Sequence, residues 1–122
     1  MTKTELLDYV RDTYSVDPDY PWEDEGYVLR HVSRKWFAVG MEVPYARLGF
    51  ERDGMADIID VKCSPLMMGD YLQQSGILPG YHMNKEHWLT ILLDGSAENE
   101  LIRELLEISY NLTKEKKIRK TK

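Results

Sequence analysis

The fold class is decided by the stretch Ile58-Ile59-Asp60-Val61-Lys62-Cys63-Ser64-Pro65. Its apolar residues alternate with polar ones, which predicts a β-strand with one apolar face. That face carries Ile59, Val61 and Cys63. Ser64 is a good helix-capping residue and Pro65 suits a first helical position, so the strand is predicted to lead straight into a short helix.

Other stretches of the chain also predict strands. Val28–Val32 is short and rich in β-branched residues, and Trp36–Met41 alternates so that Phe37, Val39 and Met41 are expected on one face. Only short connections separate these stretches from Ile58–Cys63, and short connections join antiparallel strands. Trp88–Leu93 is almost wholly apolar, which predicts a buried interior strand whose first residue, Trp88, is mainly buried.

Helices are predicted at both ends of the chain. Thr2 and Glu5 have the spacing of a capping box ahead of an apolar helical pattern. The last helix is predicted to bury the stripe Leu101, Leu105, Ile108 and Leu112. The fold is therefore predicted to be α+β, with an antiparallel sheet flanked by N- and C-terminal helices. We expect a single domain over residues 1–113, followed by a basic C-terminal tail over residues 114–122.

The formal net charge of −5 is unevenly distributed along the 122 residues. The last nine residues hold six basic side chains and one acidic side chain, whereas the preceding 113 hold ten basic and twenty acidic ones. The body of the protein therefore repels phosphate at long range, while the tail attracts it. A charged terminus of this kind is also typical of a frayed, solvated helix end.

Cysteine content and hydropathy indicate a compartment. The single cysteine, Cys63, excludes an internal disulfide and suits a reducing environment. No apolar run approaches the roughly 20 residues of a membrane span, and Met1–Glu5 lacks the apolar stretch of a signal peptide. We therefore expect a cytoplasmic protein without a membrane partner.

The residue types that could support catalysis or metal binding do not form a known pattern. His82 and His87 are five positions apart, so they do not stack on one helix face as zinc ligands, and no cysteine pair accompanies them. Cys63 lies on an apolar strand face, where a free cysteine is usually a small core residue rather than a nucleophile. The sequence has no glycine-rich phosphate loop followed by lysine. We expect no enzymatic activity, no metal and no cofactor.

The loop Pro79–Trp88 is the best candidate for a binding site. It gathers aromatic, imidazole, amide and ammonium groups on a loop anchored by a buried strand, and such groups can contact phosphate or stack on bases. The candidate ligand-binding or nucleic-acid-binding residues are Lys62, Tyr81, His82, Asn84, Lys85 and His87. The alternative is a structural loop, in which His82 and Asn84 cap the backbone and Trp88 fills the core.

Four stretches of the sequence together resemble a known family. They are Val61-Lys62-Cys63-Ser64-Pro65, Gly76-Ile77-Leu78-Pro79-Gly80-Tyr81-His82-Met83-Asn84-Lys85-Glu86-His87-Trp88, Leu92-Leu93-Asp94-Gly95-Ser96 and Ser109-Tyr110-Asn111-Leu112. They are similar to the signature of the bacterial-type MmcQ/YjbR proteins, and the resemblance covers most of the chain. It implies an antiparallel sheet flanked by helices, comparable to the frataxin homologue CyaY and described as a double wing. It also implies DNA binding.

These observations lead to one functional hypothesis and one alternative. We expect a small, non-enzymatic protein that binds nucleic acid weakly and without strong sequence preference. Tyr81 would stack on bases, and phosphate contacts would come from the tail and from the basic residues of the body, Arg34, Lys35, Lys62 and Lys85. The alternative is a protein–protein or small-ligand adaptor that uses the loop Pro79–Trp88. Salt dependence separates the two, because affinity that rests on phosphate neutralisation falls steeply with salt.

Overall fold

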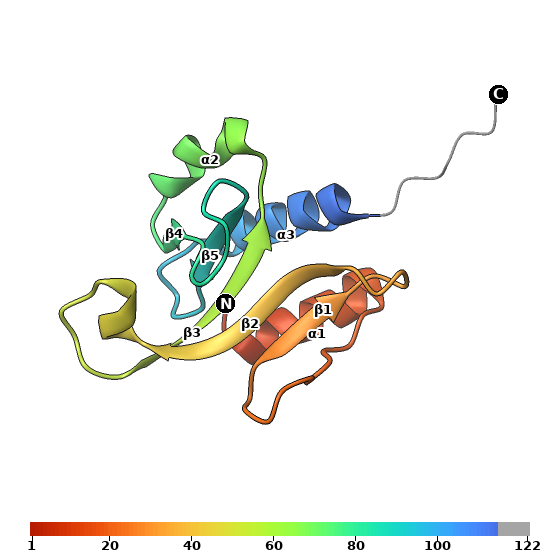
Figure 1. Ribbon diagram of the computed structural model, residues 1–122, viewed down its shortest axis with the longest axis horizontal. Helices are drawn as coiled ribbons and strands as arrows, with labels where there is room; N and C mark the ends of the chain where they lie inside the picture. The colour runs from red at the N-terminus through yellow and green to blue at the C-terminus, as the bar shows by residue number, and fades with distance from the viewer. Residues whose placement is uncertain (115–122) are drawn as a thin grey trace.

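The computed structural model describes residues 1–114, which form a five-stranded antiparallel sheet with the strand order β1-β2-β3-β5-β4 (Figure 1). The strands are β1 Tyr27–Arg30, β2 Trp36–Pro44, β3 Met55–Lys62, β4 Ile77–Pro79 and β5 Trp88–Leu92. The helices are α1 Lys3–Tyr14, α2 Pro65–Leu72 and α3 Asn99–Thr113, and a short 3-10 helix, η1, spans Tyr45–Leu48. The predicted α+β class with an antiparallel sheet and terminal helices is confirmed.

Two helix starts follow directly from local sequence. At α1 the Thr2 hydroxyl accepts a hydrogen bond from the Glu5 backbone N–H, and the Glu5 carboxylate accepts one from the Thr2 N–H, as the capping-box spacing predicts. At α2 the Ser64 hydroxyl accepts from the Leu66 N–H, and Pro65 occupies the first turn. Both features are confirmed because each depends only on residues within one turn.

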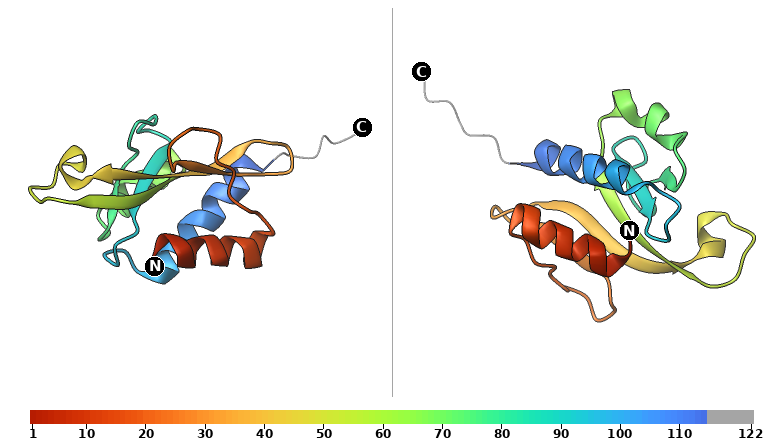
Figure 2. Two further views of the ribbon diagram at one scale, coloured as in Figure 1. Left: turned by 90° about the horizontal axis from the view of Figure 1, so that it is seen from below. Right: turned by 180° about the vertical axis from the view of Figure 1, so that it is seen from behind.

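The main core lies between the sheet and the helices. Figure 2 shows α1 and α3 on the same side of the sheet. Every second residue of the strands points to this side and packs against Leu6 and Val10 of α1 and against the inner face of α3. From β3 and β5 these residues are Ile59, Val61, Leu89 and Ile91, all fully buried. We call the opposite face of the sheet the distal face.

The buried face of α3 differs from the predicted stripe. Its buried residues are Ile102, Leu105, Leu106, Ser109 and Thr113, whereas Leu112 is 45% exposed and Leu101 and Ile108 are only partly buried. The helix is rotated so that small hydroxyl residues approach the sheet. The Ser109 hydroxyl accepts from the Lys62 N–H at 2.8 Å and donates to the Phe37 carbonyl at 2.5 Å. Backbone groups of β2 and β3, rather than apolar periodicity alone, therefore set the orientation of α3.

A β-bulge overturns the prediction that Phe37 shares a face with Val39 and Met41. Leu29 pairs with Ala38, but Arg30 pairs with Trp36, so Phe37 is an extra residue in β2. Phe37 consequently joins the helix-side core, while Met41 packs against a smaller cluster on the distal face. Strict alternation fails here because a bulge shifts the side-chain pattern by one residue.

The remaining differences concern short segments. The strand predicted over residues 28–32 is observed as Tyr27–Arg30, and β4 was not predicted because three residues are too few to show a period. Of the predicted basic tail, residues 115–122 lie outside the described residues. Within residues 1–114 no helix combines the length and the apolar character needed to cross a bilayer.

Candidate functional site

A row of aromatic and basic residues crosses one end of the distal face. Because Tyr27, Leu29, Val61 and Leu89 face the helices, their strand neighbours Arg30, Lys62 and Trp88 face the other way. Lys62 pairs with Trp88, and Arg30 pairs with Trp36, so each pair lies side by side on that face. We call Arg30, Trp36, Lys62 and Trp88 the distal row.

The β1 side of the distal row is held by aromatic contacts. The Arg30 guanidinium lies 5.7 Å from the centre of the Trp36 ring, and the Trp22 ring meets Trp36 edge-on at 5.8 Å. Arg30 also bonds the Asp19 carboxylate at 2.9–3.0 Å. The charge of Arg30 is therefore largely matched within the protein, whereas no ion pair of Lys62 is present among residues 1–114.

Trp88 is mainly buried, as predicted, but it lies outside the apolar core. Part of its side chain stays exposed and it belongs to neither apolar cluster, while its neighbours Leu89 and Ile91 are fully buried on the helix side. The apolar run of β5 has two faces, and the register places Trp88 on the distal one rather than in the helix-side core. An indole there is available for contact with a ligand.

The predicted site residues separate into two groups. The backbone of His87 lies next to the distal row. Its carbonyl accepts a hydrogen bond of 2.7 Å from the N–H of Cys63, the residue that follows Lys62. Tyr81, His82 and Lys85 instead line a pocket of about 350 Å³ beside the edge strand β4. We call it the β4 pocket, and its full lining is Arg47, Leu48, Leu78, Pro79, Tyr81, His82 and Lys85.

Asn84 has the structural role that the alternative interpretation gave it. Its side-chain oxygen accepts from the Glu86 N–H at 2.8 Å, and its carbonyl accepts from the N–H groups of His87 and Trp88. Arg47 is the functional candidate that sequence reasoning missed. It lies on η1, more than 30 positions from the loop in sequence, and only the folded chain brings the two together.

Local contacts hold the side chains of the β4 pocket in place. Tyr81 packs on the distal apolar cluster, and its N–H donates to the Thr90 hydroxyl at 2.8 Å. The His82 ring stacks on the Tyr81 ring at 4.0 Å with an interplanar angle of 13°. The Lys85 ammonium donates to the Gly80 carbonyl at 2.9 Å, which closes the loop on itself.

Asp60 is a buried carboxyl group that sequence reasoning also left without a role. It has no exposed surface, accepts from the Thr90 hydroxyl at 2.5 Å, and its Oδ2 atom has no hydrogen-bond partner among the described residues. Burial raises the pKa of Asp60 to about 7, against smaller lowering effects of Thr90, the Tyr81 backbone and the Lys85 charge. Because burial favours the neutral form of the Asp60 carboxyl, this residue adds less negative charge to the distal face than an exposed aspartate would.

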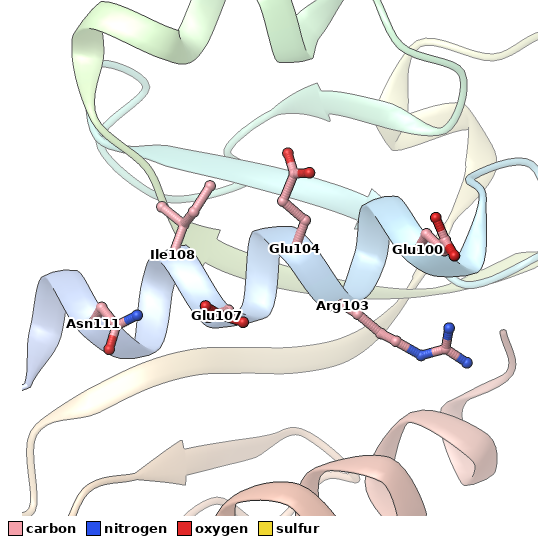
Figure 3. Close-up of a pocket in the computed structure, with 6 residues that line it drawn as sticks. All are labelled: Glu100, Arg103, Glu104, Glu107, Ile108 and Asn111. Carbon is pink, nitrogen blue, oxygen red and sulfur yellow. The ribbon is translucent and has the colours of Figure 1, made fainter.

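The helix side of the molecule is more acidic than the distal face. A hollow of about 450 Å³ along α3 is lined by three glutamates, Glu100, Glu104 and Glu107, and by Arg103. Figure 3 shows Arg103 reaching toward α1. The α1 helix adds Glu5, Asp8 and Asp12, all exposed. By contrast, the exposed or half-buried charges around β3, η1 and the Pro79–Trp88 loop are three cations, Arg47, Lys62 and Lys85, and two carboxylates, Asp57 and Glu86. The charge of this region is therefore nearly balanced, so an anion is repelled less strongly here than by the helices.

Cys63 occupies the core, and its thiol is expected to react slowly with a thiol reagent. It is 1% exposed, and burial raises the pKa of its thiol, which lowers the thiolate fraction at neutral pH. The check is labelling by a chromogenic disulfide reagent at pH 7.5, with the urea-unfolded chain as the fast control. Labelling of the native protein at the unfolded rate would contradict the assignment.

Across residues 1–114 no three His, Cys, Asp or Glu side chains gather in a metal-binding arrangement.

Comparisons with known proteins agree on one family. The profile described as YjbR matches residues 4–112. The uncharacterised protein YyaQ of Bacillus subtilis is 39% identical over 93% of this chain and 99% of its own length. A crystal structure of a Pseudomonas syringae protein has a TM-score of 0.90 at 39% identity, covering 93% of this chain and all of that one. A Deinococcus radiodurans protein has a TM-score of 0.67 at 31% identity over 92% of this chain and 78% of that one.

Proposed function

This chain belongs to the YjbR family, and we propose that it is a non-enzymatic cytoplasmic protein that binds nucleic acid through its distal face. The observation that carries the proposal is the distal row, in which Lys62 lies beside the half-buried Trp88 on an interior pair of strands. A lysine beside an indole offers one phosphate contact and one stacking surface.

The acidic composition of the body would disfavour nucleic-acid binding if the charges were spread evenly, but the acidic residues of the helices lie away from the distal face. The glutamates and aspartates of α1 and α3 lie on the helix side, so they do not face a ligand on the sheet. Asp60, on the distal face, has a pKa of about 7 and is partly neutral at physiological pH. Lys62 is then the cation of the distal row that is left free to contact a phosphate, because Arg30 is paired with Asp19.

The acidic loop near β1 limits the area of the interface. Trp22, which contacts Trp36, is followed directly by Glu23, Asp24 and Glu25, and all three are exposed. The interface is therefore centred on β3 and β5 rather than on β1. Few phosphate contacts are available there, so binding is expected to be weak and without strong sequence preference.

The test is a fluorescence-anisotropy titration of labelled single- and double-stranded oligonucleotides at several salt concentrations. Lys62→Ala should weaken binding and reduce the salt slope by about 0.7–0.9, the contribution of one phosphate contact. Deleting residues 114–122, which hold six basic side chains, should weaken binding further and flatten the slope more.

Arg11→Ala serves as the matched control, because Arg11 is exposed on the helix side and pairs with Asp8. It removes the same charge from the molecule but not from the distal face, so the slope should stay unchanged. Absence of binding at low salt would reject the function. A slope that responds equally to Arg11→Ala and Lys62→Ala would reject the distal face as the binding surface.

A further inference from the structure

We propose that the β4 pocket is a separate site for one nucleotide unit, an aromatic base bearing a phosphate group. The proposal rests on the proposed function only in choosing a nucleotide among anionic aromatic ligands. The pocket lies beside β4 and η1 and shares no lining residue with the distal row. It can therefore bind a small ligand whether or not the distal row binds a polymer.

The phosphate half of the ligand has two cations available. Arg47 comes from η1 and Lys85 from the loop before β5, and both side chains are exposed. One Lys85 donor is occupied by the Gly80 carbonyl, which holds the ammonium in place and leaves two donors for a ligand. The lining contains no acidic residue, in contrast to the hollow along α3. A cationic cleft of this kind suits a phosphate group.

The base half has a prepared stacking surface. Tyr81 is fixed against the distal apolar cluster, and His82 lies flat on it while remaining exposed. The apolar side chains of Leu48, Leu78 and Pro79 complete the lining. A planar base can thus stack on an immobilised aromatic ring beside apolar atoms, an arrangement that is tolerant of base identity. The pocket volume of about 350 Å³ lies in the range of small-ligand sites.

The backbone of His82 is left-handed, as it is at Ser15 and Arg34. Its φ angle is +59°, in the left-handed region where a glycine is less strained than a residue with a side chain. The strained residue is the one whose ring forms the stacking surface of the pocket.

The experiment measures binding of AMP, adenosine and inorganic phosphate by chemical-shift titration of the full-length protein. AMP should bind, with resonances of the β4 pocket shifting, and adenosine and phosphate should each bind roughly tenfold more weakly because each lacks one half of the ligand. Arg47→Ala should weaken AMP binding by roughly tenfold, the effect of one charge-assisted contact. No shift with millimolar AMP, or shifts at the distal row alone, would overturn the proposal.

The variant His82→Gly distinguishes a ligand-binding role of this residue from a purely structural one. The variant relieves the left-handed backbone, so its unfolding midpoint should be unchanged or higher, while AMP binding should weaken at least severalfold through loss of stacking. Ser15→Gly is the matched control, because Ser15 also has a left-handed backbone, at φ 58°, but ends α1 on the helix side. AMP affinity that is unaffected by His82→Gly would overturn the assignment of the stacking surface.

Two sources could supply the nucleotide, and one further comparison separates them. If the pocket receives the end of a strand, an oligonucleotide with a 5′-phosphate should bind more tightly than the same strand without it, and Arg47→Ala should remove the difference. If it receives a free nucleotide, the two strands should bind alike while AMP still binds. If AMP does not bind and the 5′-phosphate makes no difference, the pocket is rejected as a nucleotide site. The proposed function would still stand, since it is tested separately by the effect of Lys62→Ala on oligonucleotide binding.

Discussion

Asp60→Asn is expected to stabilise the protein at pH 8 by on the order of 2–4 kcal/mol and to have a much smaller effect near pH 4. The carboxyl is fully buried with one oxygen unpartnered, and its folded-state pKa is raised to about 7 from an ordinary 3.8. Asparagine has nearly the same shape, keeps an oxygen that can accept from Thr90, and carries no charge. The variant therefore removes the cost of burying a carboxylate.

The sign of the pH effect follows from proton binding. Between about pH 4 and pH 7 the unfolded chain has released the Asp60 proton while the folded protein retains it. Stability of the native protein attributable to this group therefore falls as pH rises through that window, by up to roughly 1.4 kcal/mol per pH unit. Urea denaturation of both proteins at pH 4.5, 6 and 8 should show a difference that grows with pH.

Asp70→Asn is a suitable control, because Asp70 is an exposed carboxyl on α2. Its stability should track that of the native protein at each pH, since surface substitutions usually change stability by less than about 0.5 kcal/mol. An Asp60→Asn protein that is less stable than the native one at pH 8 would show that the ionised carboxylate has a stabilising partner.

Gly40→Ala is expected to destabilise the protein by roughly 3 kcal/mol, the upper part of the range for overpacking a core. A Cβ atom at Gly40 would lie 2.0 Å from Cζ and 2.3 Å from Oη of Tyr27, across the β1–β2 pair. The Tyr27 ring is 2% exposed and packed in the helix-side core, so it has little room to move. The lower unfolding midpoint in urea should be accompanied by an unchanged m-value.

A double-mutant cycle identifies Tyr27 as the cause. Tyr27→Leu removes the ring atoms that a Cβ at residue 40 would meet, so Gly40→Ala should cost at least about 1 kcal/mol less in that background. Gly69→Ala is the matched control, because no atom lies within 4 Å of its Cβ position on α2. It should stabilise the helix by up to about 1 kcal/mol. Equal costs of Gly40→Ala in both backgrounds would contradict the steric explanation.

The candidate site could be predicted from sequence only in part. The loop Pro79–Trp88 was recognised by its residue types, and Tyr81, His82 and Lys85 do share a pocket. Their partner Arg47 could not be found, since η1 and this loop meet only through the packing of the distal cluster. Lys62 lies instead in the distal row, and the His87 backbone pairs with Cys63 beside it, because strand pairing decides which residues become neighbours across a sheet.

Local sequence determined the elements and their order in this protein. The caps at Thr2 and Ser64, the antiparallel strands and the terminal helices each depend on residues close together in the chain. Only the tertiary structure decided which way the side chains face. One extra residue in β2 sent Phe37 to the helix side, and Ser109 turned α3 toward the backbone of β2 and β3. The same register placed Trp88 on the distal face and enclosed Asp60, because the direction of a strand side chain depends on pairing with distant strands.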